Sequence, residues 1–158
     1  MVDLSKGRTV RANGGPRDRY PATQVARSFD GQTHSIAGDP LRLIHFYQAM
    51  GLQQVYLADL DALSCSHAAL QTKLIEQLIS SLGSATTCYL DAAVDRLDSN
   101  QRRWLSKLAL FNTNLQIVIA TECARDAHVF QELSDQWTQQ RITVSLDYKD
   151  GTWVSDGL

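Results

Sequence analysis

The chain has 158 residues, of which 44% are hydrophobic and 20% are charged, values ordinary for a soluble globular protein. Its formal net charge of −2 gives no strong field toward nucleic acid or a membrane surface, and no apolar run approaches the ~20 residues that a membrane span needs. We therefore expect a single cytoplasmic domain over residues 1–158 that binds neither nucleic acid nor membrane.

The cysteines and histidines give no sign of a metal site. Cys65, Cys88 and Cys123 are odd in number and widely spaced, and none belongs to a Cys-x-x-Cys pair. Free thiols in a reducing compartment are the plain interpretation. The four histidines do not stand at ligand spacing from these cysteines, so we predict no metal and no cofactor.

The N-terminal region combines an early acid with a basic loop. Val2-Asp3-Leu4 opens on a carboxylate, and Ala12–Pro21 is rich in Gly, Pro and Arg, which predicts a long loop. Arg17 and Arg19 in this loop are either solvated or part of an anion-binding flap, since Arg pairs bidentately with phosphate or carboxylate. Residues 22–38 show no periodicity and are predicted to be loop.

From residue 39 onward the chain alternates helices and strands. Asp39-Pro40 is a strong helix start, and Gly51 ends that helix. Apolar runs then predict strands at 54–61, 86–91, 115–121 and 142–147. Between them lie helices from Ser66 to Gly83, over 99–111 with Ser99 as cap, and over about 126–139, and a turn and short ribbon follow the last strand.

This order predicts βαβ units, whose strand ends recur about every 30 residues. The nearly continuous apolar strands, such as Ile117–Ala120, are typical of strands covered on both faces. Neither a dinucleotide fingerprint nor a P-loop follows any strand, which favours a barrel-type sheet. In such a sheet the carboxyl ends of the strands carry the chemistry, and acids stand there at Asp59, Asp91 and Asp147.

Several motifs, in this order and spacing, resemble a known family. They are Val-Asp-Leu-Ser-Lys-Gly-Arg-Thr-Val-Arg at 2–11, Gly-Gly-Pro-Arg-Asp-Arg-Tyr-Pro at 14–21, Asp39-Pro40, Val-Tyr-Leu-Ala-Asp-Leu-Asp-Ala at 55–62 and Val-Ser-Leu-Asp-Tyr-Lys-Asp-Gly at 144–151. The chain resembles the HisA/HisF family of histidine-biosynthesis (β/α)8 barrels, and above all its uncharacterised relatives. The likeness covers about the first five strands, so the fold it implies is an incomplete TIM barrel.

The resemblance implies a catalytic pair at Asp3 and Asp147, the acids that end the first and fifth barrel strands. The implied reaction is an Amadori-type aldose–ketose isomerisation of a phosphorylated sugar amine, in which one carboxyl protonates the ring oxygen and the other removes the proton from C2. No metal or redox cofactor is required. The substrate class is therefore a small phosphorylated sugar or sugar amine.

Two departures from the family pattern shape the remaining expectations. The predicted strands correspond to the first five of the eight in the family barrel, so strands six to eight are not found. In addition, Asp91-Ala92-Ala93 stands where the isomerase has a Gly-rich turn that holds a phosphate, which predicts a divergent substrate. The alternatives are a relative working in pterin-linked one-carbon metabolism and a non-catalytic, truncated barrel, which would self-associate through open sheet edges.

Several residues are candidates for substrate contact, but each could instead have a structural role. A strand-end acid can instead cap neighbouring backbone N–H groups, and we expect capping or solvation for Asp59 and Asp61 more than a place in the site. Cys88 and Cys123 are expected in or beside strands in the core, and Tyr56, Trp104, Phe130 and Trp137 at helix–sheet contacts. The substrate-binding candidates are Arg17, Arg19, Asp59, Asp91, Thr121 and Glu122.

Overall fold

A six-stranded, mostly parallel sheet forms the centre of the molecule. The computed structural model describes residues 1–13, 16–64, 70–120, 131, 135, 137, 141–146, 148–149 and 152–153. The strand order is β2-β1-β5-β6-β7-β8, in which only β2 runs antiparallel to its neighbour. The strands are β1 Val2–Ser5, β2 Arg8–Val10, β5 Gln54–Asp59, β6 Thr87–Asp91, β7 Leu115–Ala120 and β8 Ile142–Ser145.

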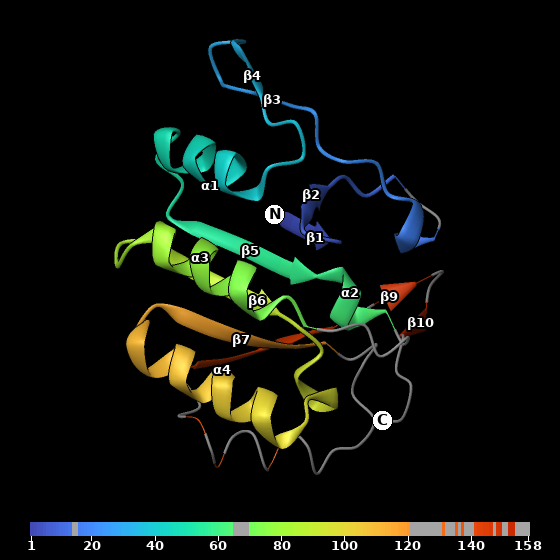
Figure 1. Ribbon diagram of the computed structural model, residues 1–158, viewed down its shortest axis with the longest axis vertical. Coiled ribbons are helices and arrows are strands. Elements are labelled where there is room, and N and C mark those ends of the chain that lie inside the picture. Colours follow the sequence, from blue (N-terminus) through green and yellow to red (C-terminus); the bar gives the residue numbers. More distant parts are fainter. Residues whose placement is uncertain are drawn as a thin grey trace.

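The main helices cover one face of this sheet (Figure 1). They are α1 Pro40–Ala49, α3 Thr72–Leu82 and α4 Ser99–Phe111, with the short helices α2 Leu60–Leu63, η1 Arg17–Arg19 and η2 Val94–Arg96 at the connections. Alternate strand residues face the helices and are fully buried, among them Leu57, Leu90 and Ile117, each at 0% exposure. Helices on a single face are the arrangement of a barrel wall, whereas a doubly wound sheet has helices on both faces.

Local signals explain most element boundaries. Asp39 caps α1 as predicted, since its carboxylate accepts from the backbone N–H groups of Leu41 and Arg42. The β1–β2 hairpin turns on Lys6 and Gly7, both with positive φ, as a two-residue turn between right-twisted strands requires.

Two predicted helix starts are wrong. Asp98, and not Ser99, is the N-cap of α4, where it forms a capping box with Gln101. The helix predicted from Ser66 begins at Thr72, after the separate short helix α2 has ended at Leu63. The true cap of α4 lies one residue before the predicted one, and α3 begins after Gln71, which makes no side-chain capping bond.

Residues 22–38 are not simply loop, because they contain a two-stranded ribbon. Strands β3 Val25–Arg27 and β4 Thr33–Ser35 pair antiparallel and stand away from the sheet beside α1 (Figure 1). A second small ribbon pairs β9 Tyr148–Lys149 with β10 Thr152–Trp153, as the turn chemistry there predicted.

The C-terminal part of the prediction is only partly covered by the described residues. Of the helix predicted over 126–139, residues 131, 135 and 137 are described, and Trp137 is buried in the core with its indole N–H donating to the Ser106 hydroxyl at 3.3 Å. In the described part of the chain β2 and β8 are the outer strands of the sheet. Phe130 and Cys123 lie outside the described residues.

Candidate functional site

The strand register brings two buried acids to the same level of the same face. Asp3 of β1 pairs with Ala58 of β5, and Ala58 pairs with Asp91 of β6. Paired residues of parallel strands point to the same side of a sheet, here the side away from the helices. Adjacent strands lie about 4.8 Å apart, so the backbones of Asp3 and Asp91 are about 10 Å apart. Ala58, between them, is 4% exposed and packs with Val10, Leu60 and Ala93.

Asp3 has the environment of an acid–base catalyst. It is 8% exposed, and burial raises the pKa of its carboxyl, an effect that the N-terminal ammonium and the guanidinium of Arg17 partly offset. The Asp3 charge in turn helps to raise the pKa of Tyr47, after burial of that phenol. A buried carboxyl with a raised pKa is a stronger base than an ordinary aspartate and keeps its proton to higher pH.

Asp91 is held in place by a tyrosine from the neighbouring strand. The Tyr56 hydroxyl donates to Asp91 Oδ2 at 2.6 Å, and Asp91 is 5% exposed. Tyr56 lies two residues before Ala58, so it faces the same side as the two acids. It packs there against the cluster of Ala58, Leu60 and Leu63, between β5 and the short helix α2. Trp104 and Cys88 pack in the core under the main helices.

The turn after Asp91 keeps a backbone that glycine favours although it carries alanine. Ala93, 3% exposed, has a φ of +47°, in the left-handed region. Its methyl group packs with Val10, Ala58 and Leu60 above the two acids. The Ala92-Ala93 pair thus replaces the glycines of the family turn, while the backbone at Ala93 keeps a glycine-type conformation.

Asp59 has a structural role on the opposite face. It pairs with Leu4 and shares the helix side with Leu57, one residue out of step with Asp3 and Asp91. Its carboxylate caps α2 and accepts both the backbone N–H of Gln71, at 2.8 Å, and the Gln71 side chain, at 2.9 Å. Asp59 therefore makes the capping contacts that we expected of it from the sequence.

Asp61 also serves the connections between elements. Strand β5 stops at Asp59, so Asp61 lies on α2 and does not continue the strand beside Asp59 as the sequence suggested. Its two carboxylate oxygens accept from the Ser5 hydroxyl, at 3.0 Å, and from the Lys6 backbone N–H, at 2.7 Å. These bonds tie α2 to the end of β1.

The two arginine candidates lie together on η1 but differ in exposure. Arg17 is half-buried and acts on the Asp3 carboxyl, whereas Arg19 is exposed. Arg17 also lines a cavity of about 150 Å³ at the end of β1, together with Lys6 and Asp61. Arg17 is thus the cation of the N-terminal loop that the structure brings to Asp3. The candidates Asp147, Thr121 and Glu122 lie outside the described residues.

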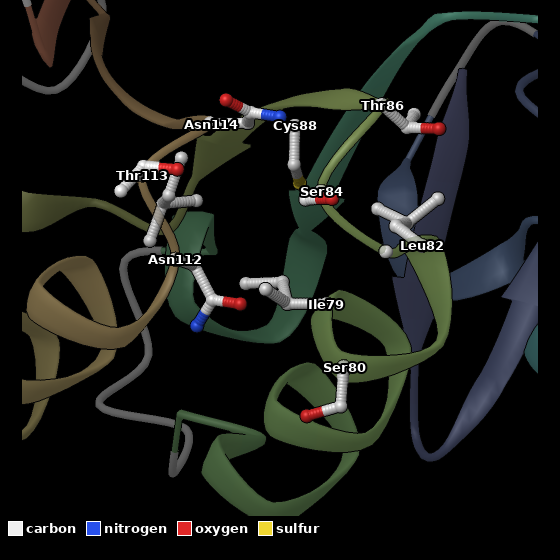
Figure 2. Close-up of a pocket in the computed structure, with 11 residues that line it drawn as sticks. Ile79, Ser80, Leu82, Ser84, Thr86, Cys88, Asn112, Thr113 and Asn114 are labelled. Carbon is white, nitrogen blue, oxygen red and sulfur yellow. The ribbon is translucent and has the colours of Figure 1, made fainter.

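A second cavity, of about 140 Å³, lies at the opposite end of β6 and β7 and close to the ends of α3 and α4 (Figure 2). Cys88 lies in its wall, and burial raises the pKa of this thiol to about 12, so the thiol keeps its proton at neutral pH. In a parallel sheet the carboxyl ends of the strands carry the site, and this cavity is at the amino ends. We therefore place the candidate site at Asp3 and Asp91.

A model of one protein family, described as "Histidine biosynthesis protein", matches residues 1–158. The chain belongs to this family. The match confirms the resemblance to the HisA/HisF family, whose members are TIM barrels. The parallel strands with helices on one face agree with that fold, although the described strands do not close a barrel. No curated protein matches the chain.

Two further observations concern the described residues alone. None of their helices combines the length and apolarity needed to cross a bilayer. Nor do three or more of their His, Cys, Asp and Glu side chains gather in a group that could hold a metal ion.

Proposed function

We propose that this chain carries acid–base machinery for aldose–ketose isomerisation of a phosphorylated sugar amine. The observation that supports this most is the Asp3 carboxyl, which is buried, has a raised pKa and stands level with the carboxyl ends of β5 and β6. In the proposed reaction Asp3 removes the proton from C2 of the opened sugar amine. Asp147, at the second family position, protonates the ring oxygen to open the ring. Loss of the C2 proton from the opened imine gives an enolamine, and delivery of a proton to C1 with loss of the C2 hydroxyl proton gives the ketose, so the steps balance as acid–base transfers.

The half-buried Arg17 supports a negatively charged substrate. Its guanidinium is close enough to Asp3 to lower the pKa of that carboxyl, and a guanidinium can bind a phosphate oxygen pair. The proposal therefore places the substrate phosphate toward η1 and the sugar carbons beside the Asp3 carboxyl, which lines a cavity.

The proton-transfer step can be tested without knowing the exact substrate. The intact protein is incubated in D2O with phosphoribosyl amines, and NMR follows the C2 proton. Exchange of this proton for deuterium, or appearance of the ketose, supports the proposal, because a base must act at C2 for either to occur. A protein that binds these compounds but leaves the C2 proton in place throughout would contradict it.

Asp91 favours a substrate that differs from the two-phosphate ribotide of the resembled isomerase. Its buried carboxylate, oriented by Tyr56, stands beside the turn at Ala93 and would repel a phosphate there. A hydroxyl or amine group suits this position better, because it can donate to a carboxylate. The proposed substrate thus carries its phosphate at the Arg17 end only.

Asp91→Asn tests this assignment. The amide keeps the shape of the side chain and can still accept from Tyr56, but it removes the negative charge. We expect the variant to bind a doubly phosphorylated sugar about tenfold more tightly than the wild type, and a singly phosphorylated one no better. Isothermal titration calorimetry with the two ligands measures both. Asp98→Asn, at an exposed helix cap, is the control and should change neither affinity. Equal affinities of wild type and Asp91→Asn for the doubly phosphorylated ligand would refute the repulsion.

A further inference from the structure

The ribbon of β3 and β4 forms an arm, residues 25–35, whose direction is set at its root. The backbone N–H of Thr23 donates to the carbonyl of Thr9, and that of Ile36 to the carbonyl of Gln24. On the arm itself, the His34 ring packs against Phe46 of α1 with ring centroids 5.0 Å apart. The arm is therefore fastened to both β2 and α1 while its outer part stands clear of the sheet (Figure 1).

The tip of the arm is a hydrogen-bonded turn that presents an aromatic ring and a negative charge. Asp30 accepts from the Ser28 hydroxyl and from the backbone N–H of Gln32, the latter at 3.0 Å. These bonds, that from Ser28 first, lower the pKa of Asp30, so the tip is anionic at neutral pH. Phe29 beside it is 90% exposed. The exposed ring therefore sits on a structured turn.

A cavity of about 410 Å³ opens at the root of the arm. Its walls are partly apolar and its rim carries two cations, Arg11 and Arg27. Two rim residues are large apolar side chains left in water, Met1 at 66% and Val25 at 59% exposure. This arm-root cavity is lined by Met1, Asp3, Val10, Arg11, Ala12, Thr23, Val25, Ala26, Arg27, Leu43, Phe46 and Tyr47.

The tip and the cavity are complementary in both polarity and charge. Seven large apolar side chains are exposed in the described part of the chain, and three of them, Met1, Val25 and Phe29, belong to the tip or the cavity rim. The anionic Asp30 at the tip matches the two arginines on the rim. We propose that two copies of this chain associate by placing the arm tip of each in the arm-root cavity of the other.

This arrangement is closed and symmetric. When two arms lie antiparallel, the distance from tip to root is the same in both copies, so a two-fold axis lets both tips reach both cavities. Each Phe side chain buries about 200 Å². With the flanking arm surface the contact falls at the small end of specific interfaces, for which we expect a dissociation constant of roughly 1–100 μM.

The contact would also reach the candidate site. Asp3 lines the arm-root cavity, so a docked tip displaces water from that side of its carboxyl. The association is inferred from the arm and its root alone, and it does not rest on the proposed isomerisation. Failure of one proposal would leave the other standing.

Sedimentation equilibrium of the intact protein tests the association. We expect a monomer–dimer equilibrium in the wild type and dissociation at least about tenfold easier in Phe29→Ser, because an aromatic anchor is lost. The matched control is Leu110→Ser on α4, another exposed apolar residue at 75% exposure, which should dimerise as the wild type does. Circular dichroism verifies that both variants are folded.

Charge exchange gives an independent check. Arg27→Glu should weaken the dimer, whereas Arg103→Glu, at an exposed site on α4, should not. Since Asp30 also holds the turn, the repulsion is introduced on the arginine side only. A wild type that stays monomeric throughout the concentration range would overturn the proposal. So would a dimer that Phe29→Ser leaves unchanged, as pairing at the edge of β8 would produce.

Discussion

Replacing Asp3 with Asn is expected to lower the rate of C2 proton exchange, and of isomerisation, by about 10²- to 10⁴-fold, the usual contribution of one general acid–base group. The amide occupies nearly the same volume but neither takes nor gives a proton at neutral pH. Asp3 pairs with Ala58 and caps no helix, so we expect the fold to accommodate the neutral amide. NMR exchange and turnover measured on the folded variant give the rate.

The same variant carries a stability signature that separates a catalytic acid from a structural one. Burial raises the pKa of Asp3 above its ordinary value of 3.8, so the folded chain keeps this proton to higher pH than the unfolded chain does. The contribution of Asp3 to stability is therefore present below pH 3.8 and is lost as the pH rises through the folded pKa. Asp3→Asn does not ionise, so it avoids the stability loss that the wild type undergoes when Asp3 gives up its proton. Urea unfolding should show its stability relative to the wild type increasing with pH across that window and constant above it.

Loss of activity together with equal or greater stability is the expected combination, because functional groups are often held at a cost to the fold. Asp98→Asn provides the control for both measurements, since Asp98 caps α4 and does not belong to the strands that carry Asp3 and Asp91. If Asp3→Asn exchanged the C2 proton at the wild-type rate, Asp3 would not be the base. If it also unfolded more easily at neutral pH, its carboxylate would be serving the fold.

The sequence predicts elements whose signals are local and misses those held by distant contacts. The helix at α1 follows from Asp39, Pro40 and Gly51, which lie within the helix or next to it. The ribbon of β3 and β4 has no apolar alternation to announce it, and its strands are mostly exposed. It exists because its root bonds to β2 and its His34 packs on α1, contacts that no short window of sequence contains.

The candidate site shows the same division. That acids end several strands is visible in the sequence, and so is their convergence at one end of a parallel sheet. Which acids share a face depends on the register between strands, and a difference of one residue reverses the face. Asp3 pairs with Ala58, so Asp91 joins it, whereas Asp59 points to the helices. Tyr56 follows from the same register, two residues before Ala58.

Asp59→Ala is expected to destabilise the fold by about 3 kcal/mol, because it leaves several buried N–H groups without an acceptor. The carboxylate has 0% exposure and receives the backbone N–H groups of Asp61, Ala62 and Gln71 as well as the Gln71 side chain. These bonds join the end of β5 to α2 and to the start of α3. For a chain of this size the loss corresponds to a melting temperature lower by roughly 6–12 °C, which differential scanning calorimetry measures.

Asp98→Ala is the matched control, because it removes a helix-capping carboxylate that is exposed and is expected to cost only about 1 kcal/mol. Both residues cap a helix through two backbone N–H groups, but Asp59 is buried and also accepts two bonds from Gln71, so the difference measures burial together with those bonds. Asp59→Asn should fall between the two, because its amide oxygen can still accept while its NH2 group opposes the Gln71 N–H. Equal losses for Asp59→Ala and Asp98→Ala would mean that water reaches the α2 cap. Asp59 would then be available to a ligand, and it would join Asp3 and Asp91 as a candidate site residue.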